Sequence, residues 1–486
     1  MVKKLYKCPG IEHTIELGMG FNWFDHLGSG GHYARWENYP LSEKVYPDLE
    51  NEEAWLEIEK GLNELGLNWI RFGLPPNPHV SETGEFIGNT VHIERLIWLN
   101  GWAEEFNKTI LIDPFLMPEY YEFPTPEGTQ NPGSSIVNMA AIDNRSYAQH
   151  FVKPLFNLLI NELGLDSVRY FNPINEPMEY GVFQTPVEST PEIIHYVEMY
   201  REIRMALDEI GIDRNRVGLI GLDGSFPEQI LRQQLIHKVD MNDLIDAYSV
   251  HHYDLKLDYL PTKYFPEKPA GYFTGGTRLA IEYRDAELLA YCRERGKTLW
   301  ALEMGTFYYG KFEKPEGVAS LEACFTVSEA IIRALNVGIT TFCIWSLMNP
   351  NTVDGHWAVI GLEDDKLHKF TYPFAFYSLL SRHIISGGTA YPLDYPWDSE
   401  LRSIYGTLIQ SEKELTILLS NNHPTTSETI EISLPDGMGI SDKFMVTKSS
   451  ENTLAEETEI IAAENGVINI EVPSLTLLGL RRLSTL

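Results

Sequence analysis

The chain has 486 residues, which exceeds the size at which one hydrophobic core stops growing, so we expect two domains. Hydrophobic residues make up 43% of it and charged residues 22%, as in soluble globular proteins. The 38 basic and 69 acidic residues give a net charge of −31, without any basic block. This charge argues against nucleic acid and anionic membranes as partners, because both bind clustered lysine and arginine.

The amino-terminal segment Met1–Cys8 contains lysines but is not followed by an apolar stretch, so it does not have the pattern of a signal peptide. No apolar run reaches the length of a transmembrane helix. The four cysteines lack pair spacing, and Cys343 lies within an apolar strand, as a small core residue would. We therefore expect a cytoplasmic protein, or a secreted one whose leader has been removed.

Between residues 15 and 383, short apolar runs alternate with longer segments of helical periodicity. This alternation is typical of βα units around a parallel sheet. The helical segments carry boundary signals: Asn51 is a candidate N-cap of one helix, and Gly66 closes the same helix. Eight strands are predicted, at Leu17–Phe24, Trp69–Gly73, Thr109–Asp113, Val168–Asn175, Val217–Leu222, Ala247–Tyr253, Thr298–Glu303 and Thr341–Ser346.

Eight strands with intervening helices predict a (β/α)8 TIM barrel over residues 1–383, with a doubly wound open sheet as the alternative. Two glutamates favour the barrel. Glu176 follows the fourth strand, in Asn175-Glu176-Pro177, and Glu303 ends the seventh. The active sites of such barrels lie at the carboxyl ends of the strands, where both glutamates are found.

After residue 383 the pattern changes to short alternating β segments separated by turn-rich sequence, without helical periodicity. This pattern predicts a second domain, an antiparallel β-sandwich over residues 384–486. Its strands are predicted at Ser403–Gln410, Leu415–Ser420, Thr429–Leu434, Phe444–Thr447, Val467–Val472 and Thr476–Leu480.

The two glutamates are the groups that double-displacement cleavage of a glycosidic bond requires. We assign Glu176 as the acid/base and Glu303 as the nucleophile. The reaction requires their carboxyl groups to lie about 5–5.5 Å apart. At that distance the charge of Glu303 would keep Glu176 protonated until a glycosyl-enzyme forms. The alternative is that each glutamate is a surface residue at a strand end.

These motifs resemble those of clan A of the retaining glycoside hydrolases, a superfamily of eightfold barrels with glutamates ending strands four and seven. The resemblance implies that Arg71 supports the nucleophile and that Asn175 binds the sugar 2-hydroxyl. It also implies that Tyr253, in the pair His251-x-Tyr253, donates to the nucleophile. Trp345 matches the tryptophan that forms the floor of the −1 subsite.

The resemblance does not single out a family within the clan. Asp113 stands where cellulase-type family 5 enzymes commonly carry a histidine. The strand-six motif and the C-terminal sandwich lean toward families 30 and 39.

Each matched residue also has a purely structural alternative. His251 and Tyr253 share one face of their strand, where both could be core residues. Trp345 could equally fill space in a core. Arg71 lies on an otherwise apolar strand, which is costly without a carboxylate partner, so we favour a functional role for it.

Other candidates lie on predicted loops. Asp25 and His26 follow the first strand in a glycine-rich segment that would suit substrate contact, although it could be an ordinary loop. Asp113 and Asp223 follow the third and fifth strands and could bind hydroxyls or cap helices. Trp357, beyond the eighth strand, could line an aglycone subsite.

We expect no cofactor and no metal. His251-His252 with Asp254 does not form a good metal site, because adjacent strand residues point to opposite faces. No phosphate-binding loop, thiol nucleophile motif or Gly-x-Ser-x-Gly elbow occurs.

The sequence thus predicts a retaining β-glycoside hydrolase acting on oligosaccharides or small glycosides, with exo action expected. One alternative is a transglycosylase of the same fold. The other is a non-catalytic carbohydrate-binding barrel, which the presence of both glutamates disfavours. The sugar, the linkage and the oligomeric state are left open.

Overall fold

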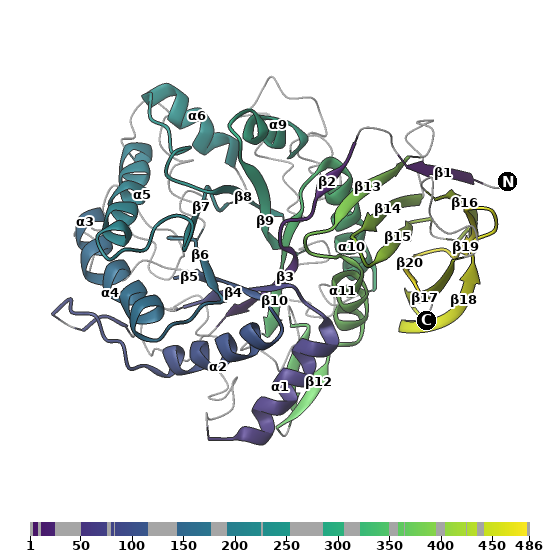
Figure 1. The fold of residues 1–486 in the computed structure, drawn as a ribbon, viewed down its shortest axis with the longest axis horizontal. Coiled ribbons are helices and arrows are strands. Elements are labelled where there is room, and N and C mark those ends of the chain that lie inside the picture. The colour runs from purple at the N-terminus through teal and green to yellow at the C-terminus, as the bar shows by residue number, and fades with distance from the viewer. Residues whose placement is uncertain are drawn as a thin grey trace.

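The structure is a computed structural model, and its described residues form a closed barrel and a second sheet beside it (Figure 1). Helices surround the barrel, and two of them lie against the second sheet. The described residues are 3–7, 11–24, 50–74, 79–81, 83–114, 143–175, 192–224, 227–252, 285–305, 321–348, 358–363, 365–394, 404–423, 425–434 and 442–483.

Eight parallel strands form the barrel, in the order β10-β3-β4-β5-β6-β7-β8-β9. Because β10 pairs with β3, the sheet is closed, which confirms the TIM barrel and excludes the doubly wound alternative. The fourth strand ends at Phe171 rather than at the predicted Asn175, since Pro173 has no N–H to continue the ladder. The bounds are β3 (Gly18–Phe24), β4 (Trp69–Gly73), β5 (Thr109–Asp113), β6 (Val168–Phe171), β7 (Gly218–Gly221), β8 (Ala247–His252), β9 (Thr298–Met304) and β10 (Thr341–Met348).

Helices connect the strands and cover the outside of the barrel (Figure 1). The predicted boundaries of the first helix are confirmed: the Asn51 side chain accepts from the Ala54 N–H, and Gly66 is left-handed at φ 69°. None of the described helices is long and apolar enough to span a membrane. The helices are α1 (Glu52–Leu65), α2 (Val91–Glu105), α3 (Asn144–Ser146) and α4 (Lys153–Phe156) within one helical run to Glu162, α5 (Glu192–Asp208), α6 (Pro227–His237), α9 (Ala286–Glu294), α10 (Leu321–Val337) and α11 (Thr371–His383).

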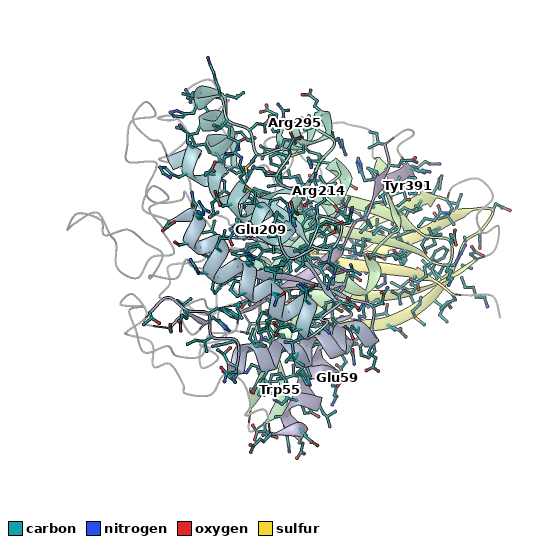
Figure 2. All side chains as sticks on the ribbon, turned by 60° about the vertical axis from the view of Figure 1, so that its left-hand side comes forward. Trp55, Glu59, Glu209, Arg214, Arg295 and Tyr391 are labelled. Atoms are coloured by element: carbon teal, nitrogen blue, oxygen red, sulfur yellow. The ribbon has the colours of Figure 1, made fainter. Side chains whose placement is uncertain are left out.

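The amino-terminal end of the barrel is filled with large side chains. The rings of Trp69 and Trp300 lie 6.4 Å apart inside the barrel, and both residues are fully buried. The Trp300 indole N–H donates to the Glu16 carboxylate at 2.8 Å. Arg214, labelled in Figure 2, pairs with Asp246 ahead of β7 and β8 at this same end. Packing and ion pairs therefore occupy this end, and the carboxyl end is left for a site.

The second sheet has its own hydrophobic core and confirms the predicted β-sandwich domain. Its strand order is β18-β17-β20-β15-β14-β13-β1-β16-β19, with β2 beside β13. A separate hairpin joins β11 (Ile360–Glu363) to β12 (Lys366–Lys369). The sandwich strands are β1 (Lys3–Lys7), β2 (His13–Thr14), β13 (Thr389–Asp394), β14 (Ile404–Gln410), β15 (Leu415–Asn421), β16 (Glu428–Ser433), β17 (Lys443–Ser450), β18 (Thr453–Ala462), β19 (Val467–Val472) and β20 (Thr476–Arg482).

The amino-terminal strand β1 lies in this second sheet, whereas residues 1–383 were expected to form the barrel domain. It pairs antiparallel with β13 and parallel with β16. The predicted antiparallel sandwich therefore contains one parallel pair of strands. Leu5 anchors the strand in the sandwich core. Five residues with one apolar anchor have too little periodicity to be assigned to a sheet whose other strands lie at the far end of the chain.

Helices α10 and α11 join the barrel to the sandwich (Figure 1). The Thr416 hydroxyl on β15 donates to the His383 carbonyl at 2.6 Å, and the Ser449 hydroxyl on β17 donates to the Ala375 carbonyl at 3.1 Å. Buried hydrogen bonds of this kind fix the position of the sandwich strands relative to α11. The sandwich therefore packs directly against helices α10 and α11 of the barrel rather than being tethered by a linker alone.

His383 makes this junction sensitive to acid. Burial lowers the pKa of His383 to about 3, and its ring lies where a side chain on Gly479 would collide with it. A histidine on an unfolded chain titrates near 6.5, so below that pH the unfolded state binds more protons than the folded state. The contribution of neutral His383 to stability is full above pH 6.5 and is lost progressively as the pH falls toward 3.

We expect His383→Leu to lose less stability than the wild type on acidification. The difference should be on the order of 4–5 kcal/mol between pH 6.5 and pH 3, at about 1.36 kcal/mol for each pKa unit. Urea unfolding of both proteins across this range measures it. Parallel pH profiles for the two proteins would show that His383 does not titrate as its burial implies.

Candidate active site

A cluster of buried polar side chains fills the carboxyl end of the barrel. Arg71 of β4 lies at its centre and is 1% exposed. The carboxylates of Asp113, Asp223 and Glu303, from the ends of β5, β7 and β9, surround its guanidinium. The barrel closure places these strand ends together, which is why residues more than 200 positions apart share one site.

The Arg71 guanidinium uses both terminal nitrogens. Its Nη1 donates to Glu303 Oε1 at 2.5 Å, and its Nη2 donates to Asn175 Oδ1 at 2.7 Å. Nη2 also lies 2.5 Å from Asp113 Oδ2 and 2.9 Å from Asp223 Oδ2. Burial acts to lower the pKa of Arg71, but the three carboxylates together raise it well above its usual value. Arg71 is therefore a permanent cation held against Glu303.

Glu303 points into the barrel because β9 carries an extra residue at this point. Relative to its neighbours, β9 shifts register between Ala301 and Glu303 on the β8 side and between Ala301 and Met304 on the β10 side. Leu302 also faces the barrel interior, so simple alternation would have turned Glu303 outward. The β-bulge thus re-aims Glu303 toward Arg71, as bulges often do near functional sites.

His251 and Asp223 form the second half of the cluster. His251 Nε2 lies 2.9 Å from Asp223 Oδ1, and its Nδ1 lies 3.5 Å from Glu303 Oε2. Burial acts to raise the pKa of Asp223, but Arg71 and His251 outweigh it and lower the pKa below its usual 3.8. His252, the next residue, contacts Asp285 at 2.6 Å, in keeping with the expected alternation along β8.

Three polar residues of the cluster were not singled out from the sequence. The amide nitrogen of Asn172 donates to Asp113 Oδ1 at 3.4 Å and also bonds Asp223. Asn22 on β3 accepts from Arg71 at 3.1 Å, and the Ser249 hydroxyl on β8 accepts from the Asp223 N–H at 2.9 Å. The signal that could have identified them is a polar side chain at an inward position of an otherwise apolar strand.

The remaining predicted residues fall into two groups. Trp345 is half-buried at the carboxyl end of β10, and Asp113 is buried with its carboxylate on Arg71 rather than open to solvent. The other predicted site residues lie outside the described part of the chain; they are Glu176, Tyr253, Asp25, His26 and Trp357.

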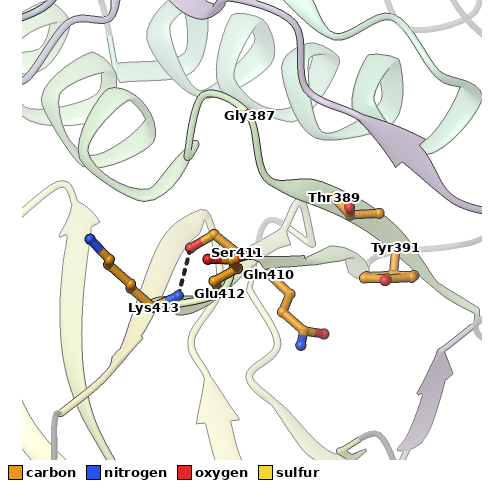
Figure 3. Close-up of a pocket in the computed structure, with 7 residues that line it drawn as sticks. All are labelled: Gly387, Thr389, Tyr391, Gln410, Ser411, Glu412 and Lys413. Atoms are coloured by element: carbon orange, nitrogen blue, oxygen red, sulfur yellow. Dashed lines mark hydrogen bonds between the residues drawn. The ribbon is translucent and has the colours of Figure 1, made fainter.

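A hollow lies on the sandwich, lined by residues of β13, of β14 and of the turn after β14 (Figure 3). Its volume is about 550 Å³, and Tyr391 is its aromatic residue. The Lys7 ammonium lies 3.5 Å from the centre of the Tyr391 ring and covers it. The Lys413 N–H donates to the Ser411 hydroxyl, so the turn at the edge of the hollow is closed by its own hydrogen bond. The hollow is polar and open, and unlike the barrel cluster it has no buried group aimed into it among its lining residues.

No protein-family model and no curated protein matches this sequence. Solved structures match over the full length. A GH30 endoxylanase from Clostridium papyrosolvens has a TM-score of 0.62 at 10% identity, with 100% of both chains covered. An α-L-arabinofuranosidase from Thermotoga maritima has a TM-score of 0.58 at 14% identity, with 99% of this chain and 100% of that chain covered. A family 44 xyloglucanase from Paenibacillus polymyxa has a TM-score of 0.57 at 11% identity, with both chains fully covered.

These likenesses show that the chain shares its barrel-and-sandwich fold with solved glycoside hydrolases. The architecture that the resemblance to clan A implied is therefore confirmed. At such low identity the fold alone is shared, and the chemistry has to be argued from the cluster around Arg71.

Proposed function

We propose that the protein is a retaining β-glycoside hydrolase that cleaves oligosaccharides or small glycosides through a covalent intermediate on Glu303. The observation that carries this proposal is the position of Glu303, 3% exposed at the carboxyl end of β9, with Arg71 on one oxygen and His251 near the other. A carboxylate contacted on both oxygens by Arg71 and His251 is fixed in direction, as a nucleophile must be.

The proposed reaction has two steps. Glu303 attacks the anomeric carbon while Glu176 gives its proton to the departing oxygen, which leaves as an alcohol. Glu176, now ionised, then takes a proton from water, and the resulting hydroxide displaces Glu303 from the sugar. Two inversions at one carbon leave the configuration retained. This scheme requires the carboxyl groups of Glu176 and Glu303 to lie about 5–5.5 Å apart.

Two further residues support a sugar-binding role for this end of the barrel. The Asn175 carbonyl oxygen accepts from Arg71, so its amide hydrogens remain as donors, which suits a sugar hydroxyl. Trp345 is half-buried near the carboxyl end of β10, where an indole would suit the apolar face of a pyranose. We assign Tyr253 as a donor to Glu303, and we expect exo action on short substrates.

The test is turnover on a panel of aryl β-glycosides and α-L-arabinofuranosides, followed by the anomeric configuration of the first product by NMR. Hydrolysis with retention, together with a 2-deoxy-2-fluoroglycoside label on the Glu303 peptide, is the expected result. Inversion, or a label on another residue, would overturn the mechanism. Sugar-to-sugar transfer that dominates at all substrate concentrations would identify a transglycosylase, and binding without turnover would identify a carbohydrate-binding barrel.

A further inference from the structure

Asp223 occupies an unusual position for an acidic residue that follows a strand. It is fully buried just after β7, and two successive residues, Leu222 and Asp223, are left-handed at φ 79° and 36°. A leucine seldom adopts this conformation, and such backbone persists only where the surroundings impose it. The Ser249 hydroxyl accepts from the Asp223 N–H and in turn donates to the Gly221 carbonyl at 3.0 Å. The backbone is thus fixed so that the carboxylate faces the cluster.

The two oxygens of Asp223 bind two different groups that both face the proposed nucleophile. Oδ2 accepts from Arg71 at 2.9 Å, and Oδ1 lies 2.9 Å from His251 Nε2. Arg71 and His251 then contact opposite oxygens of Glu303. One carboxylate therefore orients both neighbours of Glu303, and displacing it would loosen both at once.

The protonation of His251 follows from what surrounds its ring. Asp223 faces one ring nitrogen and Glu303 faces the other, and among the described residues Arg71 and Asp113 are the other charged groups of the cluster. A neutral imidazole has one N–H and would aim a lone pair at one of the two carboxylates. A doubly protonated imidazolium donates to Asp223 through Nε2 and carries its second N–H at Nδ1, the nitrogen 3.5 Å from Glu303 Oε2. It also offsets part of the excess negative charge of three carboxylates around one guanidinium.

We propose that Asp223 is a positioning residue: it holds Arg71 and His251 against Glu303 and keeps His251 doubly protonated. This inference rests on the proposed function, because it assigns Asp223 a role in preparing the nucleophile of that reaction. The pKa of Asp223, lowered by Arg71 and His251 against the effect of burial, is consistent with an ionised carboxylate at this position.

The first test observes His251 directly and needs no turnover. In full-length protein labelled with ¹⁵N-histidine, the His251 resonances are assigned by their loss in His251→Gln. Both ring nitrogens should be protonated at neutral pH in the wild type, whereas Asp223→Asn should leave a neutral ring. Asp113→Asn is the matched control, because Asp113 pairs with Arg71 and its substitution should leave His251 charged. A neutral His251 in the wild type, or an unchanged one in Asp223→Asn, would overturn the proposal.

The second test is kinetic and applies once a substrate is in hand. Asp223→Asn should lower kcat by about 10²-fold with little change in KM, the size of effect that misplacing a reacting group by about 1 Å produces. Adding Asp223→Asn to His251→Gln should cause a much smaller further loss than Asp223→Asn causes alone, because the two residues act together. Fully multiplicative losses would show that Asp223 does not act through His251.

The NMR results test the role of Asp223, whereas turnover of glycosides tests the proposed reaction, so the two proposals can fail independently. If Asp223→Asn does not fold, Ser249→Ala, which removes the hydroxyl bonded to the Asp223 N–H, should move the same His251 resonances in the same direction but less far. A protein that shows the charged His251 but hydrolyses no glycoside would contradict the proposed function while leaving the assignment of Asp223 intact. No movement in either variant would overturn that assignment.

Discussion

Glu303→Ala is expected to lower kcat/KM by about 10⁴- to 10⁶-fold, the range found when a covalent nucleophile is removed. The loss is so large because Glu176, the proposed acid/base, could still assist proton transfer but could not form the glycosyl-enzyme. Stability should not fall in parallel. Three carboxylates share one guanidinium around Arg71, so removing one of them relieves repulsion, and the midpoint of unfolding should be unchanged or higher.

The measurement is steady-state kinetics on the best substrate of the panel, together with thermal unfolding. Sodium azide should restore turnover to Glu303→Ala by attacking from the vacated side, which gives a glycosyl azide of inverted configuration. Glu209→Ala is the matched control, since Glu209 is an exposed glutamate in the turn directly after α5 (Figure 2) and its loss should leave kcat/KM unchanged. Activity that survives in Glu303→Ala would disprove the assignment of the nucleophile.

The barrel strands could be predicted from the sequence because they are buried on both faces and are bounded by turns or helix signals. Some strands of the sandwich were harder to predict. Strand β18 is mostly exposed along Thr453–Ala462 and pairs on one side with β17, so it lacks the alternation that marks a half-buried strand. Strand β13 contains Pro392, which counts against strand structure in a sequence. Such strands are defined by their neighbours rather than by their own pattern.

Part of the site could be predicted because its residues lie on barrel strands that could be predicted. Arg71, Asn175, His251 and Glu303 lie at or near strand ends, and closing the barrel is sufficient to bring strand ends together. The direction of Glu303 could not be predicted, because it depends on a β-bulge that no residue in Leu302–Met304 signals.

From the sequence, Asp223 could either bind a hydroxyl or cap a helix, because an aspartate that follows a strand serves both uses. Its role is visible only in three dimensions. The left-handed backbone turns its carboxylate toward Arg71, a residue 152 positions earlier in the chain.

Arg71→Met is expected to destabilise the protein by about 3–5 kcal/mol at neutral pH, the usual effect of removing one partner from a buried ion pair. The methionine fills similar volume, but Asp113, Asp223 and Glu303 are left without their shared cation. These carboxylates must then either remain charged in a buried site or bind protons on folding. The free energy of unfolding from urea titration at pH 7 measures the loss.

The pH dependence of this loss separates the electrostatic cause from a packing defect. Arg71 is a main reason that the pKa of Asp223 lies below 3.8 in the folded protein. That stabilisation is complete above the unfolded-state pKa and disappears as the pH falls through the folded-state value. The stability gap between wild type and Arg71→Met should therefore narrow as the pH falls below about 4 and Asp223 becomes protonated. His383 destabilises both proteins equally in acid and cancels in the difference.

Arg71→Lys is the control that keeps the charge but loses the planar fork. One ammonium cannot reach Glu303, Asp223 and Asn175 in the directions that two guanidinium nitrogens reach them. Its stability should be intermediate, while kcat/KM should fall nearly as far as in Arg71→Met, because orientation of Glu303 rather than charge alone is lost. A gap in stability that stays constant with pH would mean that Arg71 contributes by filling space. Near-normal kcat/KM in Arg71→Lys would mean that a point charge is all that the nucleophile requires.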